Sequence, residues 1–421
     1  MKVLFFAGSR PNFGNSASGN NSGGWTGMLL RGLAARPGME IGVAYLSKEH
    51  SKATTENGIR FYPITTNASH FAKIHSVFSR SWSDEKALLA GEMVCRDFAP
   101  DIIEVFGCAE SPFGLLSERI DIPLVIHIQG IMSACRNAWF PPGVGKFECL
   151  ARCMFHPRRI VQMLISWAYV AHAVRRERRI LRNCRHLIGR SDWDRRCMAL
   201  MAPKAQYYIC HEIARSVFYS PPVRSLSNRP LFVSTIGSPL YKGHDMILKT
   251  ADTLVRSGFS DFEWKVFGVD QIRMAEVATG VRARDVNVTL FGKATAEQVR
   301  SALMTATAYI HPSYIENSSA AICEAQLADV PVVATDVGGN PSFVFDSCST
   351  MLVPANDPFS MAWAMRKLAT SGPSSQLGGL EQARIEHDPE TIISKTIDIF
   401  ESILNGTEAR IQPSETISDK K

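Results

Sequence analysis

Two glutamates in the last third of the chain have a spacing that suits ligand binding. Glu316 lies in a polar loop, and Glu324 follows about two turns into a helix predicted by AAICEAQLA. Between them, Asn317, Ser318 and Ser319 favour a helix start, because their side chains cap free backbone N–H groups. Carboxylates accept hydrogen bonds from sugar hydroxyls, and a helix N-terminus attracts phosphate. The segment therefore predicts a site for a ligand with a sugar at each end and a phosphate between them.

The residues that follow make this pattern more specific. Glu316 and Glu324 precede DVPVVATDVGGNP, which runs from Asp329 to Pro341. The combined pattern resembles glycosyltransferase family 4, whose members are retaining enzymes with the GT-B fold. The resemblance implies that Glu316 contacts the donor sugar and that Glu324 contacts the ribose of the nucleotide. A surface helix with two solvated acids is the alternative.

A second motif supports the same resemblance. In TIGSPLYKGHD, a loop with Gly237 and Ser238 leads to Lys242 and Gly243 at the start of a predicted helix. This is similar to the family loop that binds the donor and whose lysine neutralises its diphosphate. Many members carry an arginine near the position of Ser238, so here another residue or the helix N-termini must supply the second positive charge. A solvated lysine at a helix start is the alternative.

The first half of the chain offers a glycine-rich loop. GSRPNFGNSASGNNSGGWTGML follows an apolar run and contains Gly23 and Gly24. Glycine lets the backbone approach a ligand closely. The resemblance places this loop over the donor phosphates and beside the acceptor, although a flexible loop is the alternative. The loop lacks G-x-G-x-x-G, which disfavours a nicotinamide cofactor.

A histidine near the end of a predicted strand is a further candidate. His127 lies in LVIHIQGI, and the resemblance implies that a polar group in this region approaches the reacting sugar. A catalytic contact and a packed core histidine are equal alternatives for His127.

The stretch IGRSDWD places Arg190 at the end of another predicted strand, where it can face the ligand. It is similar to a stretch found in family 4 enzymes of bacterial polysaccharide synthesis. Asp192 and Asp194 also fit D-x-D, the metal motif of a different glycosyltransferase architecture. Since that architecture lacks the paired glutamates, we expect no metal.

The segment 156–185 is strongly basic and contains apolar residues that include Trp167 and Tyr169. A basic helix with an apolar stretch can lie on an anionic membrane surface, which would suit a lipid-linked acceptor. A solvated helix face is an equal alternative. No run of about 20 apolar residues predicts a spanning helix.

Short apolar runs alternate with helical patterns along most of the chain, which predicts parallel α/β units. The predicted strands are 3–7, 41–45, 102–106, 124–128, 186–188, 207–210, 231–236, 262–267, 286–291, 308–311 and 332–335. The proline-rich stretch 220–230 then separates two Rossmann-like lobes, residues 1–222 and 223–404, whose parallel sheets face each other across a cleft. Residues 405–421 are polar and predict a disordered tail.

The composition is that of a soluble protein with two domains. The chain has 421 residues, 45% of them apolar, and a net charge of +6. Its ten cysteines lack metal-ligand spacing and predict reduced thiols in the cytoplasm. The inner face of the membrane is a second location consistent with the basic segment.

These features together predict a retaining glycosyltransferase of bacterial surface polysaccharide or lipid-linked glycan synthesis. The expected partners are a nucleotide-sugar co-substrate, which takes the place of a bound cofactor, and a glycan or lipid-linked acceptor. One alternative is a sugar-nucleotide epimerase of the same fold. Another is a basic protein that binds membrane or nucleic acid without catalysis, although no nucleic-acid motif is present.

Overall fold

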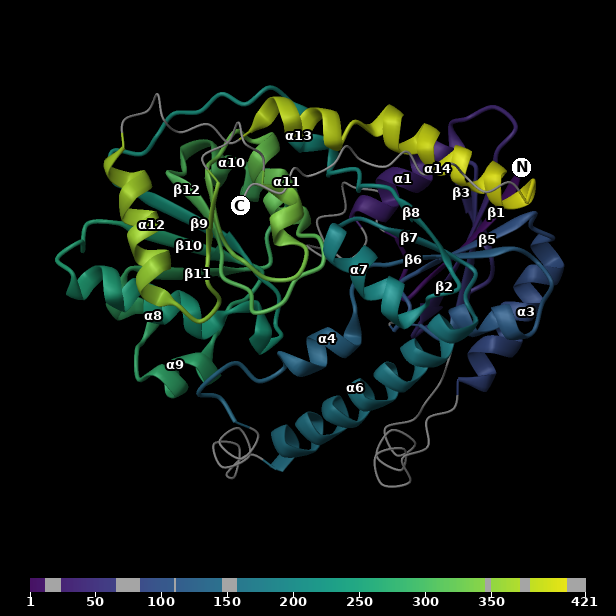
Figure 1. Ribbon diagram of the computed structural model, residues 1–421, viewed down its shortest axis with the longest axis horizontal. Coiled ribbons are helices and arrows are strands. Elements are labelled where there is room, and N and C mark those ends of the chain that lie inside the picture. The colour runs from purple at the N-terminus through teal and green to yellow at the C-terminus, as the bar shows by residue number, and fades with distance from the viewer. Residues whose placement is uncertain are drawn as a thin grey trace.

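The computed structural model describes residues 1–11, 24–65, 84–109, 111–145, 157–344, 350–371 and 379–406. The chain forms two α/β lobes that lie side by side, each built around one sheet (Figure 1). Within the described residues, no helix is both long and apolar enough to cross a membrane.

The first lobe contains an eight-stranded sheet in the order β3-β4-β2-β1-β5-β6-β7-β8. Its strands are parallel except for the antiparallel pair of β3 and β4. Both faces are buried: in β1, Leu4 and Phe6 pack into one cluster, while Val3 and Phe5 pack into the other. This explains the unbroken apolar runs in the sequence. The strands are β1 (Lys2–Ala7), β2 (Glu40–Ser47), β3 (Thr54–Glu56), β4 (Ile59–Thr65), β5 (Ile102–Phe106), β6 (Leu124–His127), β7 (His186–Gly189) and β8 (Gln206–Ile209).

The second lobe contains a six-stranded, fully parallel sheet in the order β11-β10-β9-β12-β13-β14. Trp264 of β10 is fully buried in one of its two apolar clusters, and Tyr309 of β12 lies in the other. The strands are β9 (Leu231–Thr235), β10 (Glu263–Phe267), β11 (Val288–Gly292), β12 (Ala308–His311), β13 (Val332–Thr335) and β14 (Met351–Val353).

Helices connect most of these strands, as parallel pairing requires. The α-helices are α1 (Gly24–Ala34), α3 (Glu85–Phe98), α4 (Met132–Asn137), α6 (Pro157–Asn183), α7 (Asp192–Met201), α8 (His244–Arg256), α9 (Arg273–Thr279), α10 (Ala296–Thr305), α11 (Ala320–Leu327), α12 (Pro358–Thr370), α13 (Leu380–Glu386) and α14 (Pro389–Leu404). Short 3-10 turns are η1 (Phe113–Glu118), η2 (Ser216–Tyr219), η3 (Leu240–Lys242), η4 (Ala283–Val286) and η5 (Asn340–Phe343).

All eleven predicted strands are present, with ends within two residues of those expected. Three strands were not predicted: β3, whose residues are all polar, β4, whose residues mix polar and apolar types, and the three-residue β14. Proline in IRFYPIT also disguised β4, which pairs with β2 on one side and only with the short β3 on the other.

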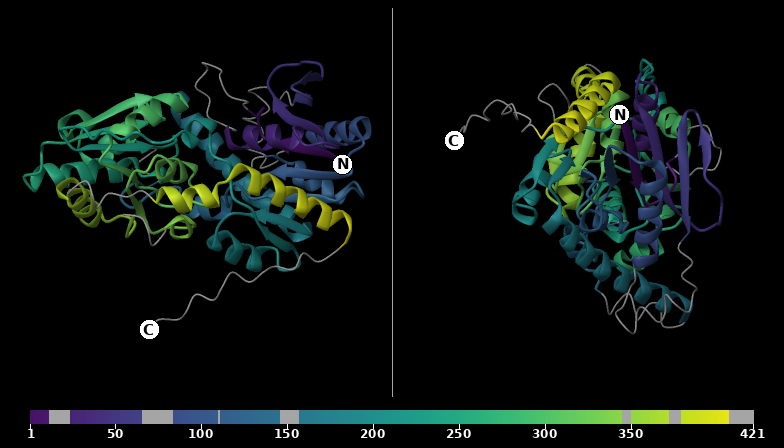
Figure 2. Two further views of the ribbon diagram at one scale, coloured as in Figure 1. Left: turned by 90° about the horizontal axis from the view of Figure 1, so that it is seen from above. Right: turned by 90° about the vertical axis from the view of Figure 1, so that its right-hand side faces the viewer.

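The last helix crosses back to the first lobe. Figure 2 shows α13 and α14 running from the second lobe onto the first. Phe400 of α14 is fully buried, and its ring lies 6.3 Å from that of Phe5 in β1. The predicted division at residue 222 falls between the two sheets, which end at Ile209 and begin at Leu231. The predicted second domain, 223–404, thus includes a helix that packs on the first lobe. Most of the predicted tail, residues 407–421, lies outside the described residues.

Candidate donor site between the lobes

The loop after β12 holds Glu316 in a partly buried ring of polar contacts. Ser319 occupies the N-cap position of α11, as predicted, but its side chain makes no capping hydrogen bond to the helix. Lys242 Nζ donates to both carboxylate oxygens of Glu316, at 2.9 and 2.7 Å. His311 Nε2 lies 3.0 Å from the same carboxylate, and Ser313 Oγ donates to it at 3.2 Å. The two predicted donor loops therefore meet in one ion pair.

The electrostatics of this pair keep Glu316 charged. Burial alone would raise the pKa of Glu316, but Lys242 and His311 outweigh it and lower the pKa to about 2. Because the folded pKa lies below the ordinary value of 4.5, the ion pair stabilises the fold above that pH. The contribution is lost as the pH falls toward 2. At neutral pH the site holds a full negative and a full positive charge next to each other.

Glu324 has a different partner. Arg215 Nε and Nη2 donate to its two oxygens, both at 2.6 Å. Burial raises the pKa of Glu324 despite this arginine. A carboxylate has roughly four lone-pair positions, so a bidentate arginine leaves room for hydroxyl donors. Arg215 was not predicted from the sequence, because no local pattern distinguishes this arginine in the loop HEIARSVFY.

Two consecutive glycines fix the backbone around Glu316. A Cβ on Gly338, where φ is +52°, would lie 1.9 Å from the carbonyl oxygen of Glu316. A Cβ on Gly339 would lie 1.7 Å from that of Asn317. The backbone N–H of Gly339 donates to the carbonyl oxygen of Glu316 at 3.1 Å. The Gly-Gly turn of the sequence motif is thus a backbone clamp on the Glu316 loop.

Residues 317 and 318 face the first lobe. Ser191 Oγ at the start of α7 donates to Asn317 Oδ1 at 3.0 Å. Ser318 Oγ donates to Glu212 Oε1 at 3.3 Å. These two side chains, predicted to bind the donor, therefore form hydrogen bonds between the lobes, while Asn317 Nδ2 lacks a hydrogen-bond partner among the described residues.

The loop before Lys242 borders a cavity of about 540 Å³. Gly243, at φ +85°, must be glycine, because a Cβ there would lie 2.1 Å from the carbonyl oxygen of Pro312. Gly237 accepts a hydrogen bond from His244 Nε2 at 2.8 Å. Ser238 lines the cavity together with residues that follow β10 and β11. Ligands of parallel sheets bind at such carboxyl ends of strands. Its lining is Ser238, His244, Gly268, Val269, Asp270, Gln271, Gly292 and Lys293.

His127 is a core residue of the first lobe. Only 1% of it is exposed, and its Nδ1 lies 2.8 Å from Glu104 Oε1. Burial lowers the pKa of His127 and outweighs the effect of Glu104, which raises it. Its ring packs 4.9 Å from Trp25 of α1. Its Nε2 has no hydrogen-bond partner among the described residues.

Arg190 lies beside this core. Its guanidinium is 5.1 Å from the Trp25 ring and donates to the carbonyl oxygens of Ile128 and Gln129, both at 3.0 Å. It also pairs with Glu212. Burial lowers the pKa of Arg190 to about 10, so the group stays charged at neutral pH.

The glycine-rich loop is described only at its end. Gly24 begins α1, and a Cβ there would approach the Arg215 side chain to 3.3 Å. Gly23 and the preceding residues from 12 onward lie outside the described residues. The structure thus places the start of α1 next to the cation that holds Glu324.

The two aspartates of the D-x-D pattern, Asp192 and Asp194, lie in the first turn of α7. Ser191 and Asp194 form a reciprocal cap at its start, and Asp194 also accepts a hydrogen bond from Tyr207. Asp192 pairs with Arg195 and is exposed. In the described part of the chain, no cluster of three or more His, Cys, Asp or Glu could hold a metal. Metal independence itself stays a prediction.

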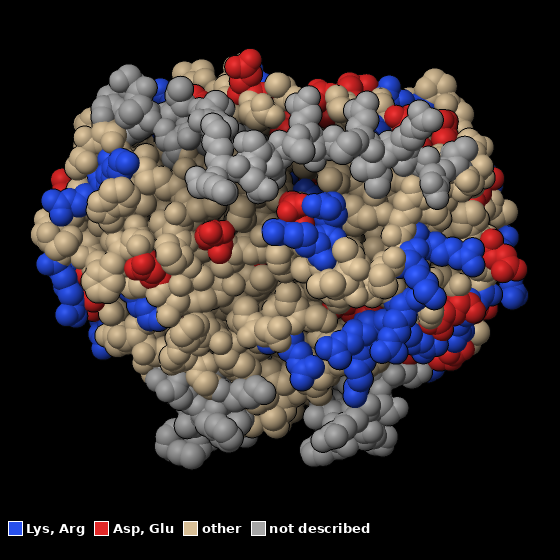
Figure 3. Space-filling model, viewed as in Figure 1, with Lys and Arg blue, Asp and Glu red and all other residues tan. Residues whose placement is uncertain are grey.

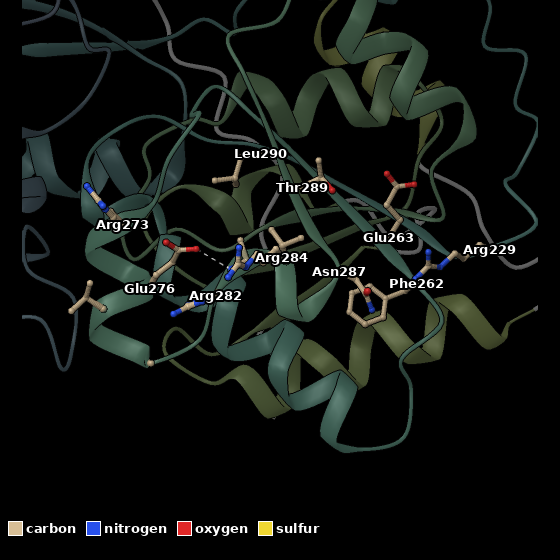
Figure 4. Close-up of a pocket in the computed structure, with 14 residues that line it drawn as sticks. Arg229, Phe262, Glu263, Arg273, Glu276, Arg282, Arg284, Asn287, Thr289 and Leu290 are labelled. Carbon is tan, nitrogen blue, oxygen red and sulfur yellow. Dashed lines mark hydrogen bonds between the residues drawn. The ribbon is translucent and has the colours of Figure 1, made fainter.

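A larger cavity, of about 1080 Å³, lies elsewhere. Figure 4 shows it lined by Arg229, Arg273, Arg282 and Arg284. Its other residues include Glu263 and Val288, which begin β10 and β11. These are the amino ends of the strands, opposite the ends that carry the Lys242 and Glu316 loops. Volume alone therefore does not locate the donor site.

We predict that Lys242→Met raises the pKa of Glu316, because burial then acts against fewer positive charges. Loss of an opposite charge at this range should raise it by roughly 1–3 pH units. Carbon-13 NMR titration of labelled glutamate measures the shift. Lys265→Met, which removes a cation 3.6 Å from Glu263, is the matched control. An unchanged pKa of Glu316 in the Lys242 variant would show that Lys242 does not lower this pKa.

Comparison with known proteins agrees with this geometry. Residues 227–371 match the family described as "Glycosyl transferases group 1". The D-inositol 3-phosphate glycosyltransferase of Corynebacterium diphtheriae is 33% identical over 107 residues, 25% of each chain. That of Streptomyces avermitilis is 30% identical over 118 residues, 28% of this chain and 25% of the relative. The matches span about a quarter of the length of these relatives.

Solved structures match nearly the whole chain at low identity. Sucrose-phosphate synthase of Thermosynechococcus elongatus has a TM-score of 0.72 at 14% identity and covers 97% of this chain and 100% of its own. WaaG, a glycosyltransferase involved in lipopolysaccharide biosynthesis, has 0.62 at 16% and covers 95% and 99%. Anabaena HepE in complex with UDP-glucose has 0.61 at 14% and covers 96% and 100%. The fold is GT-B, and the match of the second lobe to group 1 glycosyl transferases supports a glycosyltransferase.

Proposed function

We propose that this chain is a retaining family 4 glycosyltransferase, which moves a sugar from a nucleotide-sugar donor to an acceptor hydroxyl. The observation that carries the proposal is the partly buried Lys242–Glu316 pair, formed where two strand ends of the second lobe meet. The lobe that holds this pair is also the part of the chain that matches the family. The likeness to WaaG suggests a role in a bacterial surface polysaccharide or lipid-linked glycan.

The donor would lie along the carboxyl ends of the second sheet. The cavity beside Ser238 would take the nucleoside, and the free lone pairs of Glu324 would accept the ribose hydroxyls. Lys242 and the start of α11 would face the diphosphate. Glu316 would then accept hydrogen bonds from the donor sugar. UDP-glucose is the first donor to test, since Anabaena HepE was crystallised with it.

In this arrangement the enzyme accelerates transfer by electrostatic stabilisation of the leaving diphosphate. As the sugar leaves the diphosphate, negative charge grows on the phosphate oxygens, and Lys242 stabilises it in a largely water-excluded site. The leaving phosphate accepts the proton of the acceptor hydroxyl on the same face, which preserves the anomeric configuration. Proton NMR of the product would test retention, and an inverted anomer would contradict it. The first lobe supplies the acceptor.

Arg190 is our candidate for the second cationic side chain that binds the diphosphate, besides Lys242. It comes from the first lobe, stays charged although 98% buried, and has no hydrogen-bond partner for Nε among the described residues. Its neighbour Ser191 is hydrogen-bonded to Asn317, the residue after Glu316, which supports a position of Arg190 near the donor site. A diphosphate between the lobes would offset the cost of burying this cation.

The outward face of α6 supports the predicted contact with an anionic membrane. At spacings of three and four residues, one stripe changes from apolar to basic: Val161, Leu164, Ala168, Ala171, Arg175, Arg178 and Arg182. Its arginines are exposed, and Figure 3 shows basic side chains gathered over this part of the molecule. Such a helix can rest on acidic headgroups while its apolar end enters the interface. The enzyme would then act in the cytoplasm at the inner face of the membrane.

Replacing Glu316 by glutamine should lower sugar transfer by about 100-fold or more, because the neutral amide no longer complements the donor sugar and Lys242. The donor is first chosen by a thermal-shift screen of sugar nucleotides, in which a ligand at 100 times its Kd adds about 2.7 kcal/mol of stability. Glu263→Gln, an exposed glutamate paired with Lys265, is the control. Full transfer by the Glu316 variant would refute the site, and isomerised donor without acceptor would indicate an epimerase.

Arg190→Met should lower kcat by about 100-fold and weaken binding of a nucleoside diphosphate more than that of the nucleoside. Since this variant leaves Glu212 buried without its partner, the double variant with Glu212→Gln tests the same point in a charge-balanced site. Arg195→Met on the surface of α7 is the control. Wild-type turnover in the double variant would exclude Arg190 from diphosphate binding.

Replacing Arg175, Arg178 and Arg182 by serine should weaken binding to vesicles that contain phosphatidylglycerol by roughly 100-fold, at about 1 kcal/mol per basic residue. Sedimentation with such vesicles, compared with pure phosphatidylcholine vesicles, measures the effect. The matched control replaces three exposed arginines of the second lobe, Arg273, Arg282 and Arg284. Equal losses in both triple variants, or no binding of the wild type at physiological salt, would contradict a membrane contact through α6.

A further inference from the structure

An aromatic contact spans the two lobes next to the donor site. The ring of Trp139, which follows α4 in the first lobe, lies 5.7 Å from that of Tyr241 in the second lobe. Tyr241 precedes Lys242, whose Nζ is 5.7 Å from the Tyr241 ring. Both aromatic side chains are partly exposed. An aromatic surface therefore borders the place where the donor sugar would sit.

The next residue links this contact to α6. Phe140 packs edge-on against Trp167 of α6, with ring centroids 5.2 Å apart. The segment is fixed from its other end as well, because Glu177 of α6 accepts hydrogen bonds from the backbone of Met132 and Ser133 at 2.6 and 3.0 Å. Glu177 is fully buried. The α4 segment is thus held by α6 at two points while Trp139 reaches the opposite lobe.

The apolar surface continues from Trp167 toward the start of α6. Leu164 lies one turn before Trp167, and Val161 lies one turn before Leu164. Both side chains are 39% exposed. A row of aromatic side chains therefore extends from the donor site to the apolar end of the stripe on α6. Its members are Tyr241, Trp139, Phe140 and Trp167.

We propose that the acceptor is a glycolipid, a substrate class that rests on the proposed transferase function. Its sugar would stack through its C–H face on Trp139 and Tyr241, because aromatic faces carry partial negative charge. Its apolar chain would follow Phe140 and Trp167 toward α6. A free glycan would gain nothing from the apolar part of this path, whereas each buried CH₂ of a chain contributes about 0.8 kcal/mol.

The transfer step breaks one bond and forms another. The bond between the anomeric carbon and the diphosphate oxygen breaks, and the pair of electrons leaves with the diphosphate. A new bond forms between that carbon and the acceptor hydroxyl oxygen, whose proton passes to the leaving diphosphate. No other reactant is needed.

The test compares methyl and n-octyl glycosides of glucose, galactose, mannose and N-acetylglucosamine as acceptors. Each is assayed with the donor found by the thermal-shift screen. We expect at least one octyl glycoside to be used with kcat/KM about tenfold or more above its methyl counterpart. The ratio should fall toward one in Trp139→Ala and Phe140→Ala, mainly through KM, and return in Trp139→Phe. Trp363→Ala removes an exposed tryptophan of α12 and should keep the ratio.

Two outcomes separate the proposals. Hydrolysis of the donor without acceptor reports on the transferase chemistry alone. If donor is hydrolysed but octyl glycosides are used no better than methyl glycosides, or none is used, the glycolipid inference is overturned and the proposed function stands. If no sugar nucleotide is bound, hydrolysed or transferred, the proposed function itself fails. Thermal melts of each variant show that a changed ratio does not arise from unfolding.

Discussion

The close approach of two backbone segments is the constraint on which the site depends. Gly338 and Gly339 lie so near the carbonyl oxygens of Glu316 and Asn317 that no side chain fits between them. This contact gives the loop after β12 one shape. From that shape follow the direction of the Glu316 carboxylate, the start of α11 and the polar contacts of Asn317 with the first lobe. The charges of the site are thus placed by backbone packing.

Within this frame, the two carboxylates of the site each have their own cation. Lys242 pairs with Glu316, and Arg215 pairs with Glu324. A carboxylate buried without a partner would cost several kcal/mol, so these cations are part of what makes the site stable. A charged ligand could enter by exchanging partners with these groups. Arg190 and Glu212 repeat this arrangement on the side of the first lobe.

Patterns local in the sequence were predictable, and contacts between distant segments were not. Eleven strands, the start of α11 at Ser319 and the start of α8 after Lys242 follow from apolar runs and from the residue types that favour helix starts. The pairing of Lys242 with Glu316 joins residues 74 apart, and that of Arg215 with Glu324 joins residues 109 apart. No periodicity encodes such pairs. Sequence left two roles open for His127, and its 1% exposure shows that it is packed in the core, with no hydrogen-bond partner for Nε2 in the part of the chain that the structure describes.

The return of α14 to the first lobe has a consequence for motion and for folding. Among the described residues, the chain crosses between the lobes twice, before β9 and again between α13 and α14, and Tyr219 Oη donates to the His387 carbonyl at 2.7 Å where the crossings meet. Because two chain segments join the lobes, any rotation of one lobe against the other must bend both segments. Ile392, Ile399 and Phe400 also complete the core of the first lobe. During synthesis, therefore, the first lobe can complete its core only after the second lobe has been made.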